Sequence, residues 1–143
     1  MPALPAKLFD EIEALANAGD TLYEAGDYKA AIAKYKAGYA LVPAPKEEWE
    51  IGTSLLIAIG DTQFAAGEFA KAVETLTAAS FTPSGMGNPF VHLRLGQSLF
   101  ETGELDLAAE SLQRIRGHGD DSIFEDEDPK YLAFLQSRVP NHN

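Results

Sequence analysis

The sequence contains no cysteine among its 143 residues, which excludes disulfide bonds, a thiolate nucleophile and a cysteine-ligated metal. It also contains no apolar run long enough to cross a membrane. The first residues, Met1 to Lys7, lack the apolar stretch of a signal peptide. From these absences we expect no membrane association and a cytoplasmic location.

Basic residues are scarce, because 11 lysines and arginines stand against 22 aspartates and glutamates. The resulting formal net charge of −11 repels phosphate backbones, so we expect no nucleic-acid partner. The same charge favours association with basic proteins. A second interpretation is that the acidic residues only keep the surface soluble.

Residue patterns that are typical of catalysis are absent as well. His92, His118 and His142 form no HxxxH or HExxH metal-binding pattern, and no Gly-x-Ser-x-Gly motif marks a nucleophile. We therefore predict no enzymatic activity, no cofactor and no metal. His92 falls on the packing side of a predicted helix, where we interpret it as a core residue.

What is present is one pattern in three copies, which read GDTLYEAGDY at 19–28, GDTQFAAGEF at 60–69 and GQSLFETGEL at 96–105. Each copy has a glycine, a second glycine seven residues later, then an acid and a large apolar residue. The second glycine suits the left-handed position after a helix, and the acid suits the positive start of the next helix. Three copies predict three helical hairpins.

Small residues follow the hairpin motif at fixed steps, for example Ala31, Ala72 and Ala108. With these residues the pattern resembles the tetratricopeptide repeat over residues 8 to 116, although the copies are spaced more widely than the family's unit of about 34 residues. The resemblance implies an all-α, right-handed solenoid of three hairpins and a C-terminal capping helix. It also implies one domain, 1–143, with repeats at about 8–43, 46–83 and 89–116 and a capping segment at 120–139.

Apolar periodicity and the proline and glycine positions give the expected helices. The third helix carries Trp49 on an extension at its start, where we expect the indole to pack against the preceding hairpin. We expect Ile123 and Phe124 to fold back on the last repeat, and a helix that begins at Pro129 to cover the last hairpin's apolar face of Leu107, Leu112 and Ile115. The predicted spans are 5–25, 27–41, 46–66, 68–80, 89–102, 104–116 and a seventh helix from 129.

The resemblance places the first helix of each hairpin on the concave wall. Residues three or four apart share a helix face, so Tyr23, Phe64 and Phe100 are predicted to form an aromatic column beside Asp20 and Asp61. Such aromatics are common at interface hot spots, although they equally serve packing. The predicted partner-binding groove consists of Asp20, Tyr23, Glu24, Ile57, Asp61, Phe64, Phe90, Leu93, Arg94, Gln97, Phe100 and Glu101.

These residues favour a non-catalytic protein-interaction module, a monomer whose partner is a basic or apolar protein or peptide. One subclass of the family binds acidic chaperone tails with a clamp of lysine, asparagine and arginine. Here Ala16, Asp20 and Phe90 occupy clamp positions and only Arg94 matches, which argues against that function.

Two more specific functions and one of a different class stay open. The stretches 87–100 and 124–132 resemble small bacterial repeat proteins encoded beside polymorphic toxins, which implies an immunity protein that neutralises a toxin. The alternative is a type III secretion chaperone that holds a translocator segment in its groove, because size, acidity and repeat number agree. A self-assembling structural scaffold is the third.

Overall fold

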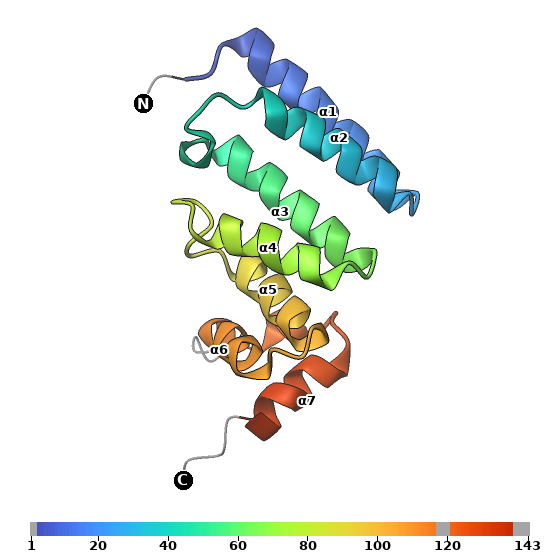
Figure 1. Cartoon of the computed structure of the whole chain (residues 1–143), viewed down its shortest axis with the longest axis vertical. Helices are drawn as coiled ribbons and strands as arrows, with labels where there is room; N and C mark the ends of the chain where they lie inside the picture. The colour runs from blue at the N-terminus through green and yellow to red at the C-terminus, as the bar shows by residue number, and fades with distance from the viewer. Residues whose placement is uncertain (1–2, 117–120, 139–143) are drawn as a thin grey trace.

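A computed structural model describes residues 3–116 and 121–138 and shows a stack of helical hairpins (Figure 1). Within these residues there is no strand. The predicted all-helical solenoid is confirmed. The helices are α1 (Ala6–Glu24), α2 (Tyr28–Leu41), α3 (Glu50–Ala65), α4 (Phe69–Ser80), α5 (Pro89–Glu101), α6 (Leu105–Arg116) and α7 (Pro129–Arg138), with 3₁₀ turns η1 (Lys46–Glu48) and η2 (Ser122–Phe124).

The three tight turns within the hairpins use glycine as the sequence predicts. Gly26, Gly67 and Gly103 have φ angles of 80°, 79° and 84°, a left-handed conformation that side chains with a Cβ rarely adopt. In the first turn Asp27 caps α2 by accepting a hydrogen bond of 3.2 Å from the backbone N–H of Ala30. These turns reverse the chain and hold the two helices of each hairpin together.

The first glycine of each copy has a different role, because it lets the second helix of the hairpin approach closely. A Cβ placed on Gly19 would lie 2.5 Å from the ring of Tyr35, and one on Gly60 would lie 2.5 Å from Leu76. At Gly96 the nearest atom, 2.7 Å away, belongs to a leucine of α6. The same close approach of the two helices therefore repeats in all three hairpins.

The third helix begins later than predicted, at Glu50, and the predicted extension is a separate 3₁₀ turn. The ammonium group of Lys46 donates hydrogen bonds to the carbonyl oxygens of Tyr39 at 2.9 Å and Val42 at 2.5 Å, and so satisfies the end of α2. Trp49 donates from Nε1 to the carbonyl of Pro43 at 3.1 Å. As predicted, the indole packs against the preceding hairpin.

The C-terminal segment closes the last hairpin. Leu135 of α7 is fully buried and Phe124 of η2 is almost so, and both pack with Leu112 and Ile115 of α6. Leu107 is the exception to the predicted capping, because it is 51% exposed and lines a different groove on α6. α7 thus covers only the side of α6 that carries Leu112 and Ile115.

The remaining local predictions also agree with the structure. Asn88 caps α5 by accepting a hydrogen bond of 2.9 Å from the backbone N–H of Phe90. His92 is buried, and its Nε2 lies 2.9 Å from the carbonyl oxygen of Met86, as a satisfied core histidine should. His118 and His142 lie outside the described residues.

Candidate protein-binding groove

The inner face of the stack is defined here by the first helix of each hairpin, α1, α3 and α5. All twelve predicted groove residues lie on these helices, but the structure divides them into an open part and a covered part. The open part lies between the C-terminal halves of α1 and α3, where Asp20, Tyr23, Glu24 and Asp61 line a cavity of about 260 Å³. Tyr35, Ala58 and Thr62 complete its lining.

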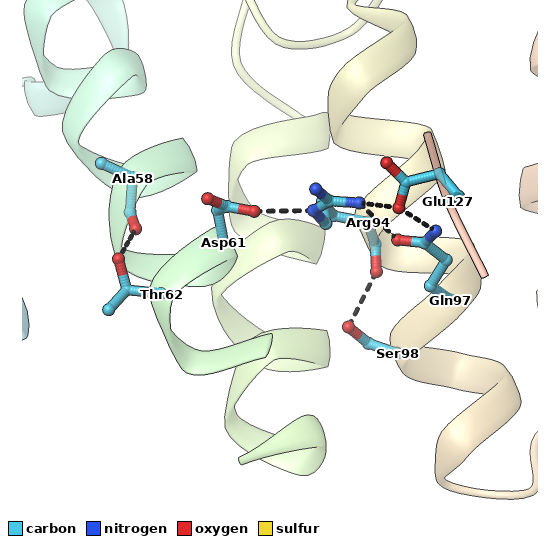
Figure 2. Close-up of polar contacts among 7 residues, drawn as sticks. All are labelled: Ala58, Asp61, Thr62, Arg94, Gln97, Ser98 and Glu127. Atoms are coloured by element: carbon cyan, nitrogen blue, oxygen red, sulfur yellow. Dashed lines mark hydrogen bonds and ion pairs between the residues drawn. The ribbon is translucent and has the colours of Figure 1, made fainter. Parts of the chain in front are cut away.

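The open cavity is acidic, and the carboxylate of Asp20 is held in place. Tyr35, which packs on Gly19, donates a hydrogen bond of 2.6 Å to Oδ1 of Asp20. Thr62 donates to the carbonyl of Ala58 at 2.6 Å, so its hydroxyl hydrogen is turned toward its own helix (Figure 2). The cavity therefore presents carboxylate oxygens to an incoming group, which is an environment for a cation.

The two tyrosines of this cavity stay protonated well above neutral pH. Burial and then the charge and hydrogen bonding of Asp61 raise the pKa of Tyr23 to about 12. Burial and the hydrogen bond to Asp20 raise the pKa of Tyr35 further. The carboxylates are thus the charged groups of the cavity, and the phenols contribute only neutral hydroxyls.

A largely buried ion network lies between the open part and the covered part, and Figure 2 shows its contacts. Arg94 of α5 pairs through Nε with Oδ1 of Asp61 at 2.6 Å and through Nη1 with Oε1 of Glu127 at 2.6 Å. Gln97 lies in the same network, since its Oε1 accepts from Arg94 at 2.8 Å and its Nε2 donates to Glu127 at 2.7 Å. Two helices, α3 and α5, and the segment before α7 meet at this point.

The guanidinium of Arg94 is also enclosed by aromatic rings, because it lies 5.1 Å from the centroid of Phe64 and 4.8 Å from that of Phe90. Although burial favours the neutral form, the carboxylates of Asp61 and Glu127 raise its pKa. Only 15% of the side chain is exposed. Arg94 is therefore engaged by contacts within the molecule and is not a free side chain of the groove.

The covered part of the groove lies under α7. Tyr131 packs against Phe64 and Phe100 with centroid distances of 6.4 Å and 5.5 Å, and Phe134 lies 5.0 Å from Phe100. Glu101 accepts a hydrogen bond of 2.6 Å from the hydroxyl of Tyr131. The chain's own C-terminal helix thus covers the third member of the predicted aromatic column.

The charged side chains of this covered part pair with one another. Lys130 pairs with Glu101 at 2.8 Å. Partial burial of Glu101 opposes its ionisation, but the hydrogen bonds from Lys130 and Tyr131 prevail and lower its pKa. Leu93 and Gln97 are buried with 2% and 0% exposure, so a partner does not reach them while segment 121–138 is in place.

The aromatic column is therefore not one continuous surface. Tyr23 packs on Tyr28 at 5.4 Å within the first turn, and Phe64 packs on Phe69 at 5.6 Å within the second. Ile57 is half-buried on α3 between the two ends of the groove. Glu127, Lys130 and Tyr131 were missed by sequence reasoning, because neither spacing nor periodicity shows which helix a connecting segment contacts.

Other kinds of site find no support in the part of the chain that the structure describes. Residues 3–116 and 121–138 contain no group of three or more histidine, aspartate or glutamate side chains that is arranged to hold a metal ion. Among these same residues no helix is long and apolar enough to span a bilayer.

Comparison with known proteins supports the fold. A family model described as tetratricopeptide repeat matches residues 57–122. No curated protein matches the sequence. The family match over residues 57–122 and the solved structures agree that the hairpin stack has the tetratricopeptide-repeat fold.

Three solved structures illustrate the likeness. The type III secretion chaperone SycD from Yersinia enterocolitica, in complex with a peptide of the translocator YopD, has a TM-score of 0.71 at 17% identity over 90% of this chain and 92% of that chain. PcrH from Pseudomonas aeruginosa has a TM-score of 0.70 at 17% identity, with 94% of each chain covered. PcrH in complex with the chaperone binding region of PopB has a TM-score of 0.69 at 17% identity, over 94% of this chain and 100% of that chain. At this identity the likeness extends to the fold.

Proposed function

We propose that this chain, a tetratricopeptide-repeat solenoid, is a non-catalytic protein-interaction module that binds a basic segment of a partner on the inner face of α1 and α3. The observation that carries the proposal is the open acidic cavity at Asp20, Glu24 and Asp61. The part of the inner face that α5 forms is covered by α7 and the segment before it. Among the predicted groove residues, those of the open cavity are thus the ones that a partner reaches directly.

The charges of the cavity favour a lysine or arginine. Asp20 and Glu24 are exposed, and no cation pairs with either among the described residues. Asp61 uses one carboxylate oxygen, Oδ1, in its ion pair with Arg94. A hydrogen bond to a charged group contributes about 1.5–3 kcal/mol, and less where water reaches it. A basic side chain between these carboxylates would therefore orient a partner and accelerate its encounter.

A chaperone for a secreted protein is the version that the structural neighbours favour. SycD is a type III secretion chaperone solved with a peptide of the translocator YopD, and PcrH was solved with the chaperone binding region of PopB. The match covers 92% of the SycD chain and 100% of the PcrH chain. A solenoid of this size thus accommodates a partner segment. In this version the partner is an unfolded stretch of a translocator-like protein.

An immunity protein is the second version, and the charge of the molecule favours it. A net charge of −11 suits a basic toxin, whose active surface the inhibitor would cover. The two stretches on which that resemblance rests are in contact, since Arg94 and Gln97 bind Glu127. The two versions differ in what is bound: a chaperone holds an unfolded segment, whereas an immunity protein binds a folded domain.

Selection of random dodecapeptides displayed on phage against the full chain tests the shared proposal. We expect enriched peptides that carry lysine or arginine and whose binding weakens with added salt. Enrichment of acidic peptides, or no enrichment at all, contradicts the binding of a basic segment. For the two versions, limited proteolysis of the partner co-purified from the native host separates an unfolded segment from a folded domain.

A further inference from the structure

A second cavity lies at the opposite end of the same two helices. It measures about 570 Å³ and is lined by residues from the starts of α1 and α3. Leu4, Phe9 and Trp49 contribute apolar surface, and Asp10 and Glu50 are acidic residues of the same lining. None of the twelve predicted groove residues lines this cavity.

The apolar surface of this cavity is partly open. Phe9 is 39% exposed although it is a large apolar side chain. Trp49 beside it is fixed, because its indole donates to the carbonyl of Pro43. A rigid aromatic wall with an exposed phenyl ring is suited to hold one apolar side chain of a partner.

The two cavities lie on one continuous helix face, because positions three or four residues apart share a face. α1 and α3 run in the same direction in Figure 1, α2 packs against both, and each cavity is lined by residues of α1 and α3. Between the cavities lie the small residues Ala16, which is half-buried, and Ser54, which is exposed. The face passes through Phe9, Glu13, Ala16 and Asp20 on α1 and through Glu50, Ser54, Ile57 and Asp61 on α3.

The distance between the cavities defines a spacing in the ligand. Phe9 and Asp20 are eleven residues apart on α1, which corresponds to about 17 Å along a helix with a rise of about 1.5 Å per residue. An extended peptide advances about 3.3 Å per residue. Two of its side chains that occupy the two cavities are therefore about five residues apart.

We infer that the inner face of α1 and α3 recognises an extended basic segment at two points, with an apolar side chain against Phe9 and a lysine or arginine at Asp20. The two anchors are four to six residues apart, from the helix rise and strand rise above. This inference rests on the proposed function and adds to it the second anchor and the spacing. Asp10 and Glu50 at the apolar end attract further positive charge in the same segment.

Charge also selects this occupant over a second copy of the chain. Both cavities carry acidic residues, and each copy has a net charge of −11, so two copies repel one another at this face. A basic segment gains at both ends from the same charges. The partner is therefore a heterologous protein segment.

The test compares dodecapeptides selected on the wild-type chain with their binding to Phe9→Ala, measured by fluorescence anisotropy. Phe81→Ala is the matched control, because Phe81 is a phenylalanine that is 78% exposed and lies away from both cavities. We expect peptides with the predicted spacing, about a tenfold loss of affinity with Phe9→Ala and unchanged affinity with Phe81→Ala. Two glycines inserted into the peptide between its two anchor residues should weaken binding by a similar factor.

Each other outcome overturns the inference in a distinguishable way. Peptides that need Asp20 but are indifferent to Phe9→Ala and to the inserted glycines leave the proposed function standing and remove the second anchor. The absence of any selected peptide removes both. A change of oligomeric state on Phe9→Ala, seen by analytical ultracentrifugation, identifies a second copy as the occupant. Because Phe9 is partly exposed, its variant should fold; Asp10→Lys with Glu50→Lys tests the same end by charge.

Discussion

Replacement of Arg94 by methionine probes the network that joins α3, α5 and the C-terminal segment. Arg94 is 15% exposed, and its partners Asp61 and Glu127 are 20% and 17% exposed at their side chains. The variant leaves two carboxylates facing each other without a cation. The loss of one partner from a fully buried pair costs about 3–5 kcal/mol, and partial exposure reduces this to about 2–4 kcal/mol.

The predicted change is large enough to measure by urea unfolding and by thermal melting, both followed by circular dichroism. For a domain of this size a loss of 1 kcal/mol lowers the Tm by about 3 °C, so the Arg94→Met variant should melt about 6–12 °C below the wild type. Methionine preserves much of the contact with the rings of Phe64 and Phe90. The loss therefore reports the ion network rather than a cavity.

A matched control is available in the pair of Arg114 and Glu110, whose side chains are 59% and 61% exposed. Arg114→Met should change stability by about 0.5 kcal/mol or less. In a double-mutant cycle with Glu127→Gln, Arg94→Met should show a coupling energy above about 1 kcal/mol. Equal losses at Arg94 and Arg114, or additive effects in the cycle, would refute the reasoning about this network.

Three further predictions follow from packing and charge. Gly60→Ala should lower stability by about 1–3 kcal/mol in urea unfolding, because the new Cβ would lie 2.5 Å from Leu76; Gly87→Ala, with nothing within 4 Å, is the control and should lose far less. Hydrogen bonds from α7 lower the pKa of Glu101 despite its partial burial, so the wild type should exceed Glu101→Gln in stability above the ordinary glutamate pKa of 4.5, and the difference should shrink as the pH falls through the lower folded-state value. Deletion of residues 129–143 should lower the melting temperature or cause association, since each large side chain thereby uncovered contributes about 1.5–3 kcal/mol when buried; an unchanged, monomeric melt contradicts the capping role.

The helices and turns could be predicted from the sequence because their determinants are local. Gly26, Gly67 and Gly103 mark the hairpin turns directly, and Asp27 and Asn88 mark helix starts. The predicted start of the third helix, at Lys46, was wrong by four residues, because Lys46 begins η1 and α3 begins at Glu50. Here a lysine that caps the preceding helix competes with helix propensity, and periodicity carries no information about such a contact.

The groove was less predictable, because it depends on contacts between distant segments. Tyr23 and Asp61 share a cavity as the stripe on α1 and α3 suggested. Phe100 and Glu101 lie on the equivalent stripe of α5, yet Tyr131 of α7 covers them. The helix that begins at Pro129 was expected, but its docking across α5 follows from packing that no repeat pattern encodes.

The account's central claim is that the acidic cavity between α1 and α3 binds a basic partner segment. The direct measurement is the affinity of a phage-selected basic dodecapeptide, by fluorescence anisotropy, for the variant Asp20→Lys with Glu24→Lys. The variant Glu74→Lys with Glu125→Lys has the same net charge, and its exposed sites lie outside the cavity. The account predicts at least about a tenfold loss for the cavity variant and little change for the control. Equal affinities for the two variants would contradict it.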